Sequence, residues 1–368
     1  MKRNLFSIFV LLLIMATAMG PARAQNTQTR TLTGIPQGWT VTADGQSVTA
    51  NADGSYTIAA GAAVKLIPPT EVKPTVQNVT VERRNPLTVP LTLEALTDGT
   101  IQVNINGTLT TGMKYSVNGG QKTTITTTEN ITVAAGDRVQ FYGNGTSTTV
   151  YGNSPRLVKL QGSGSGFQTK VYGNIMSLVN EEGYDTATTL SGNKVFASLF
   201  LHDTTLTDAS GLLLPATTLA QNCYNSMFQG CTALTAAPAE LPATELAPRC
   251  YYFMFNNCTS LTTAPELPAT ELDSSCYYHM FDKCTSLTAA PELPATELVY
   301  SCYSYMFHNC SSLSSVTCLA TSGINQDFST NNWLYGVAAT GTFTKAANVI
   351  WDAGTNGIPS GWNVVEAQ

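Results

Sequence analysis

Eight of the nine cysteines in this chain of 368 residues form four pairs, and the two members of each pair are eight residues apart. Where the compartment is oxidising, paired thiols can form disulfides. If every step between the two were helical, their Cα atoms would lie about 12 Å apart, too far for a disulfide. Two alternatives stay open: bridges formed where a helix ends before the second cysteine, or columns of buried thiols that pack as small apolar groups. The candidate disulfide residues are Cys223, Cys231, Cys250, Cys258, Cys276, Cys284, Cys302 and Cys310, and Cys318 is left over.

Aromatic residues follow the first cysteine of each pair. The residue directly after it is always tyrosine, which predicts a buried or half-buried column. The next two positions vary between copies, and we expect them to be half exposed. Exposed rings in a row can stack on sugars or anchor a protein partner, whereas the alternative is ordinary surface coverage. The candidate ligand-binding residues are Tyr252, Phe253, Tyr278, His279 and Tyr305.

The ionisable residues form no catalytic or metal-binding set. The chain has three histidines, and none has the spacing of a Ser-His-Asp, Cys-His or metal-binding arrangement. Glutamates recur identically in successive copies, whereas glycoside cleavage needs one special pair of carboxylates. Solvated columns of glutamate are favoured over a cation-binding stripe. The sequence therefore predicts no enzyme, no metal and no cofactor. The two glutamate columns are Glu240, Glu266 and Glu292, and Glu245, Glu271 and Glu297.

A repeated unit must position these side chains. Cys223, Cys250, Cys276 and Cys302 begin four copies at spacings of 27, 26 and 26 residues, and a degenerate copy begins at Val195. Within each copy, apolar residues at positions i, i+4, i+5 and i+8 predict one face of a short helix, which a short strand and a proline-fixed return follow. One copy alone cannot bury its methionine, phenylalanine and leucines. We therefore expect the copies to stack, with methionines and phenylalanines in continuous core columns.

The region before the copies has a β pattern. Short alternating runs separated by turn signals extend from Thr29 to about Arg84 and again from about Leu91 to Tyr172. The runs 101–105 and 138–142 are examples from the second region. Regularly spaced short strands of this kind predict sandwich-like all-β modules.

The motif inside the copies resembles a known family. One copy reads Cys250-Tyr-x-x-Met254-Phe255-x-x-Cys258-Thr-x-Leu261, followed by Leu-Pro-Ala-Thr-x-Leu over 267–272. This pattern resembles the BspA-like leucine-rich repeats of surface proteins from gut and oral Bacteroidetes, and the resemblance covers about 195–318. The tail resembles the segments that follow such repeats. The resemblance implies a cell-surface or secreted protein with an adhesin-like role and without catalytic residues.

The N-terminus has the pattern of a secretory signal peptide. A basic start is followed by an apolar run from Leu5 to Met19 and by Ala22-Arg23-Ala24, which predicts cleavage after Ala24. The formal net charge of −6 and the 11% of charged residues disfavour nucleic acid as a partner. We expect an exported protein at the cell surface or secreted, with the periplasm possible, and without membrane insertion after cleavage.

The predicted fold class is multidomain, with all-β modules followed by a leucine-rich-repeat-like α/β solenoid. The expected domains are a signal peptide (1–24), a small β module (25–90), a sandwich-like module (91–175), the solenoid (176–322) and a C-terminal cap (323–368). The expected function is non-catalytic recognition of a host or microbial surface protein or glycan by the repeat surface. The alternatives are a structural subunit of the envelope or an appendage, and an accessory to a glycan-processing system.

Overall fold

The computed structural model describes residues 29–32, 40–44, 46–51, 55–59, 64–67, 86–106, 109, 112–143 and 158–367. The chain forms two compact units, Met1–Val81 and Glu82–Gln368. The predicted signal peptide lies outside the described residues. No helix among the described residues is long and apolar enough to cross a membrane.

The first unit has only antiparallel strands among its described residues. Strand β1 (Thr29–Leu32) pairs with β4 (Tyr56–Ala59). Strand β2 (Thr40–Ala43) lies between β3 (Gln46–Val48) and β5 (Val64–Ile67). The sequence has short β-type runs at 39–42 and 47–49 on either side of Asp44-Gly45, and these runs overlap β2 and β3, so this part of the chain is β as expected.

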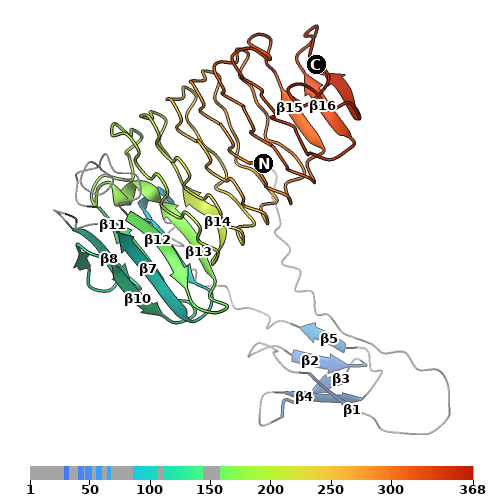
Figure 1. Ribbon diagram of the computed structural model, residues 1–368. Helices are drawn as coiled ribbons and strands as arrows, with labels where there is room; N and C mark the ends of the chain where they lie inside the picture. Colours follow the sequence, from blue (N-terminus) through green and yellow to red (C-terminus); the bar gives the residue numbers. More distant parts are fainter. Residues whose placement is uncertain are drawn as a thin grey trace, which may run out of the picture. The chain divides into compact units, whose positions relative to one another are not determined.

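The second unit begins with two sheets, in which the strand orders are β10-β7-β12 and β14-β13-β6-β11-β8-β9 (Figure 1). The strands predicted at 101–105 and 138–142 are confirmed as β7 and β11. Apolar residues alternate along these strands, because successive side chains of a strand face opposite sides of the sheet. The elements are η1 (Pro86–Thr88), β6 (Thr92–Ala95), β7 (Gly99–Ile105), β8 (Met113–Val117), β9 (Thr123–Ile125), β10 (Glu129–Val133), β11 (Arg138–Tyr142), β12 (Val158–Ser163), β13 (Thr169–Asn174), η2 (Ile175–Leu178) and β14 (Leu206–Leu213).

The degenerate first copy joins the repeats to these sheets. Its strand β14 pairs in parallel with β13, as the sixth strand of the larger sheet. Asp203, which stands where later copies have their second cysteine, is 1% exposed. Its carboxylate accepts hydrogen bonds from the backbone N–H of Gly162 in β12 at 3.2 Å and from Thr205. The first copy departs from the consensus because one of its sides packs on a sheet instead of on another copy.

The predicted α/β leucine-rich-repeat solenoid is wrong. Residues 195–318 are all described and contain no α-helix, and the strand expected around Leu261 is absent. The copies are joined by isolated parallel bridges, such as Ala236 with Thr263 and Glu240 with Glu266, instead of by continuous strands. In Figure 1 the copies are drawn as successive coils between β14 and β15.

Left-handed residues explain why no helix forms. Arg249, directly before the copy that begins at Cys250, and Phe253 and Asn257 within that copy have φ angles of 56°, 56° and 59°. The equivalent residues at the next two copies are also left-handed. A left-handed residue at every fourth position breaks a right-handed helix into successive turns. The spacing of four and eight residues between apolar side chains therefore reflects a backbone turn that repeats every four residues, not the 3.6 residues per turn of an α-helix.

The backbone hydrogen bonds follow the same alternation. Cys250, Met254 and Cys258 each donate the backbone N–H group to the carbonyl three residues earlier in the chain. The left-handed residues donate to the next copy: Phe253 to Tyr278 at 2.9 Å, for example. An α-helix would use every interior N–H group within itself. Here about half of the donors are free to join one copy to the next, and the stacking of copies satisfies them.

The predicted core columns are confirmed. The methionines and phenylalanines of the four full copies are 0% exposed. The rings of Phe200, Phe228, Phe255, Phe281 and Phe307 stack at centroid distances of 5.3, 5.3, 5.6 and 5.5 Å. The predicted tyrosine column is also buried: Tyr224, Tyr251, Tyr277 and Tyr303 are each 1–2% exposed.

A small parallel sheet follows the last copy. Its strands are β15 (Ser315–Cys318), β16 (Gly341–Lys345) and β17 (Trp362–Glu366), in that order. Trp333 continues the tyrosine column by stacking on Tyr303 at 6.1 Å, and Trp351 stacks on Trp333 at 5.4 Å. These indoles cover the last copy, so the C-terminal region caps the repeat core.

Candidate functional site

The five predicted aromatic residues lie together on the repeats. Tyr252, Phe253, Tyr278, His279 and Tyr305 are all half-buried and form one continuous group, which we call the aromatic strip. The structure confirms their expected partial exposure. Their role in binding stays a prediction.

The rings of the aromatic strip form two parallel stacks, each of which we call a file. In one, Tyr252 stacks on Tyr278 at 4.8 Å and 7°. In the other, Phe253 stacks on His279 at 4.7 Å and His279 on Tyr305 at 4.4 Å. Edge-to-face contacts join the files, since Tyr278 meets His279 at 4.5 Å and 62°. Neighbouring rings of each stack cover the faces between them, so along its length the strip presents ring edges and the hydroxyl groups of its tyrosines.

A row of polar side chains accompanies the strip. The Gln229 amide donates to Asn256 Oδ1 at 3.1 Å, and the Asn256 amide donates to Asp282 Oδ2 at 2.9 Å. Asp282 also meets the Nδ1 atoms of His279 and His308, each at 2.9 Å. The side chain of Asp282 is 6% exposed. Gln229, Asn256, Asp282 and His308 occupy the same position in successive copies, six residues after the first cysteine.

Asp282 makes part of the stability depend on pH. Burial by itself would raise its pKa, but hydrogen bonds from His279 and His308 and the charges of these rings hold the pKa of Asp282 below its usual value. When the folded pKa lies below the unfolded one, the carboxylate stabilises the fold above the unfolded pKa, and this contribution is lost as pH falls through the folded pKa.

We therefore expect the urea midpoint to drop more steeply on acidification in the wild type than in Asp282→Asn. The amide cannot ionise, so its interactions do not change over the interval in which Asp282 takes up a proton. Urea unfolding between about pH 6 and pH 2 measures the difference, because ordinary aspartates titrate near 3.9. If the urea midpoints of the two proteins fell in parallel with pH, Asp282 would not be the source of the pH dependence.

The cysteines are free and buried in the structure. The second cysteine of each pair donates its Sγ–H to a phenylalanine carbonyl of the preceding copy, as Cys258 does to Phe228 at 3.1 Å and Cys310 to Phe281 at 2.9 Å. None of the eight candidate disulfide residues is bridged. Burial raises the pKa of Cys223 to about 11 and that of Cys318 to about 12.

Such thiols should be inert until the chain unfolds. The thiolate is the reactive form, and it is scarce when the pKa lies far above neutral pH. In the native protein we expect almost no labelling by an alkylating reagent within minutes. In denaturant without reductant, all nine cysteines should be alkylated, as counted by intact mass. Alkylation of only one cysteine after unfolding would show that the four pairs are disulfides.

The repeated glutamates are exposed, as the preference for solvated columns predicts. All six lie at the surface, and Glu240 with Glu266 and Glu245 with Glu271 are bridge partners in adjacent copies. Among the described residues, no cluster of histidine, cysteine, aspartate or glutamate side chains fits a metal ion.

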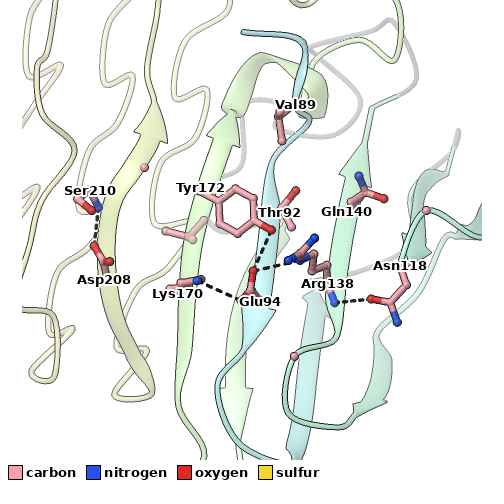
Figure 2. Close-up of a pocket in the computed structure, with 14 residues that line it drawn as sticks. Val89, Thr92, Glu94, Asn118, Arg138, Gln140, Lys170, Tyr172, Asp208 and Ser210 are labelled. Carbon is pink, nitrogen blue, oxygen red and sulfur yellow. Dashed lines mark hydrogen bonds and ion pairs between the residues drawn. The ribbon is translucent and has the colours of Figure 1, made fainter. Parts of the chain in front are cut away.

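A groove that the sequence analysis missed lies on the outer face of the six-stranded sheet. This sheet groove has a volume of about 940 Å³ and is lined by residues of β6, β11, β13 and β14 and by neighbouring loops (Figure 2). Strand register places Asp208, Lys170, Glu94 and Arg138 side by side across β14, β13, β6 and β11.

A second row runs parallel to this one, two residues further along the strands. It contains Tyr172, Thr92 and Gln140, which are neighbours across β13, β6 and β11. Ser116 of β8 continues the row, and its hydroxyl lies 3.1 Å from Gln140 Oε1. The two rows make a continuous polar floor.

Glu94 is the centre of the sheet groove. It accepts hydrogen bonds from Arg138 Nε at 3.2 Å and Tyr172 Oη at 3.0 Å, and Lys170 Nζ lies 3.0 Å away. Burial alone would raise the pKa of Glu94, but the bonds from Lys170 and Tyr172 and the adjacent charges lower it. Burial, together with the bond to Glu94, raises the pKa of Tyr172 to about 12. Glu94 is therefore ionised and Tyr172 neutral at neutral pH.

No family model matches the chain, and neither a curated protein nor a solved structure matches it.

Proposed function

We propose that the protein is an exported, non-catalytic recognition protein, at the cell surface or secreted, that uses the aromatic strip to bind a surface protein of a host or another microbe. The single observation behind the proposal is that the five variable aromatic slots come together as one stacked strip over three copies. The sequence pattern of the N-terminus supports export.

The geometry of the strip favours a protein over a sugar. A sugar stacks on an open ring face, and within each file of the aromatic strip the neighbouring rings cover these faces. Ring edges and tyrosine hydroxyls suit the mixed apolar and polar contacts of a protein interface, where tyrosine is enriched. Stacking also immobilises the rings before binding, which reduces the entropy lost on association.

Alanine variants in the strip test the proposal. The wild-type chain without residues 1–24 is assayed by surface plasmon resonance against immobilised extracellular-matrix and epithelial surface proteins. Loss of a central interface tyrosine often weakens binding by about 2 kcal/mol, roughly thirtyfold. We expect a loss of this size for Tyr278→Ala and no change for Phe328→Ala, a matched aromatic whose side chain is 63% exposed outside the strip.

The outcomes separate the alternatives. If Tyr278→Ala and Phe328→Ala bind the same protein with equal affinity, the aromatic strip is not the interface. Self-assembly of the purified protein into fibres, without binding to any protein of the panel, would favour a structural subunit instead. Protease treatment of intact cells, with released peptides identified by mass spectrometry, tests the proposed surface location.

A further inference from the structure

The sheet groove is a binding site of a different kind from the aromatic strip. It lies on the sheets that precede the full copies, and its volume of about 940 Å³ is within the range of small-molecule sites, about 300–1,000 Å³. We propose that it binds a neutral oligosaccharide. The groove combines balanced charges, unused hydrogen-bonding groups and one aromatic ring.

The charges of the groove floor cancel. Asp208 and Glu94 alternate with Lys170 and Arg138 across four strands, so the row contains two charges of each sign. Lys170 and Arg138 are both already engaged by Glu94. A phosphate or carboxylate ligand would meet Asp208 and Glu94 as like charges, and a cationic ligand would meet Lys170 and Arg138 as like charges. The floor therefore favours an uncharged ligand.

Several polar groups of the floor have unused hydrogen-bonding capacity. Arg138 uses Nε for Glu94, and among the described residues its terminal amino groups contact no acceptor. The Oε1 atom of Gln140 is bonded to Ser116, whereas its amide N–H groups have no acceptor in the described part of the chain. Asp208 accepts the N–H of Ser210 through Oδ1 and offers Oδ2. Hydroxyl groups both donate and accept, so a sugar can satisfy this mixed set.

Tyr172 supplies an apolar surface beside these polar groups. In Figure 2 its ring is seen face-on next to Glu94 and Thr92. Among the described residues no aromatic ring stacks on it, in contrast to the rings of the aromatic strip, and Lys170 Nζ lies over the ring at 5.9 Å from its centroid. The electron-rich face of an aromatic ring attracts the partly positive C–H groups that line one face of a pyranose.

The site is also rigid. Three donors from the two strands that flank β6 hold Glu94, and one of them is the Tyr172 hydroxyl, which fixes the ring against the floor. A preorganised site loses little conformational entropy on binding. The row spacing is set by neighbouring strands, about 4.8 Å apart. An extended chain of sugars lying across β13, β6 and β11 would meet successive polar groups.

Isothermal titration calorimetry with defined sugars tests the proposal on the chain without residues 1–24. The probes are neutral tetrasaccharides of glucose, mannose, galactose and N-acetylglucosamine, with tetragalacturonate as the anionic counterpart. We expect one of the neutral sugars to bind, with at least tenfold weaker affinity in Tyr172→Ala and in Gln140→Ala. Tyr172→Phe keeps the ring and should lose less than Tyr172→Ala. Gln140→Ala removes a side chain that makes one hydrogen bond, to Ser116. It therefore provides a second test if Tyr172→Ala does not fold.

Tyr278→Ala is the matched control. It removes a half-buried tyrosine of the aromatic strip and should leave sugar affinity unchanged, so that failure at one site is distinguished from failure at the other. The proposal is overturned if none of the neutral sugars binds at millimolar concentration, if only tetragalacturonate binds, or if Tyr172→Ala and Gln140→Ala bind as tightly as the wild type.

Discussion

Phe281→Ala should lower the free energy of unfolding of the second unit by about 4 kcal/mol, since burial makes phenylalanine-to-alanine changes among the most destabilising in protein cores. Phe281 is 0% exposed and lies in the middle of the phenylalanine column. Its ring stacks on Phe255 at 5.6 Å and on Phe307 at 5.5 Å, with interplanar angles of 2°. The substitution would leave a cavity that interrupts the column between two copies.

Urea unfolding followed by tryptophan emission measures this loss, because Trp333, Trp351 and Trp362 lie in the second unit. Phe328→Ala is the control with the same chemical change at a side chain that is 63% exposed. Surface substitutions of this kind usually change stability by less than about 0.5 kcal/mol. Equal losses for the two variants would show that the column does not stabilise the stacked copies.

Asp203→Ala should have a comparably large effect, by a different mechanism. The side chain joins the first copy to the smaller sheet by accepting from the Gly162 N–H and from the N–H and hydroxyl of Thr205. Alanine would take this acceptor from the N–H groups of Gly162 and Thr205, at about 1–3 kcal/mol each, whereas the Thr205 hydroxyl still has Thr169 Oγ1 at 3.4 Å. We expect a total loss of about 3 kcal/mol or more.

Two further variants separate hydrogen bonding from simple truncation at this junction. Asp203→Asn keeps one carbonyl oxygen and should retain part of the stability. Asp185→Ala truncates an aspartate that is only half-buried and should have little effect. The same urea experiment measures all three. If the urea midpoint of Asp203→Ala equalled that of the wild type, other contacts would hold the first copy to the smaller sheet.

The core columns of the repeats could be predicted from sequence, but the backbone that carries them could not. Apolar residues at spacings of four and eight fit both a helix and a repeat of four residues, because the two periods differ by less than one residue over eight. The deciding feature is the left-handed backbone. Glycine and asparagine usually mark such positions, yet here they include Phe253, His279 and Tyr305.

The aromatic strip and the sheet groove differ in how far the sequence reveals them. The variable aromatic positions that follow Tyr251 and Tyr277 could be predicted, because aligning the repeated copies with one another shows which positions vary. The sheet groove depends on cross-strand register, which brings Arg138 beside Glu94 and Glu94 beside Lys170 from distant parts of the chain. Alternation along each strand predicts that these side chains face outward. It does not predict which strands become neighbours.

The backbone bonds that alternate within and between copies have a consequence for the length of the protein. Each interior copy offers the same donors on one side and the same acceptors on the other. A chain that gained or lost one unit of 26 residues would therefore keep matching surfaces at every junction. Duplication would add another rung of aromatic side chains without redesigning the fold, and avidity for an extended partner would rise with the number of rungs.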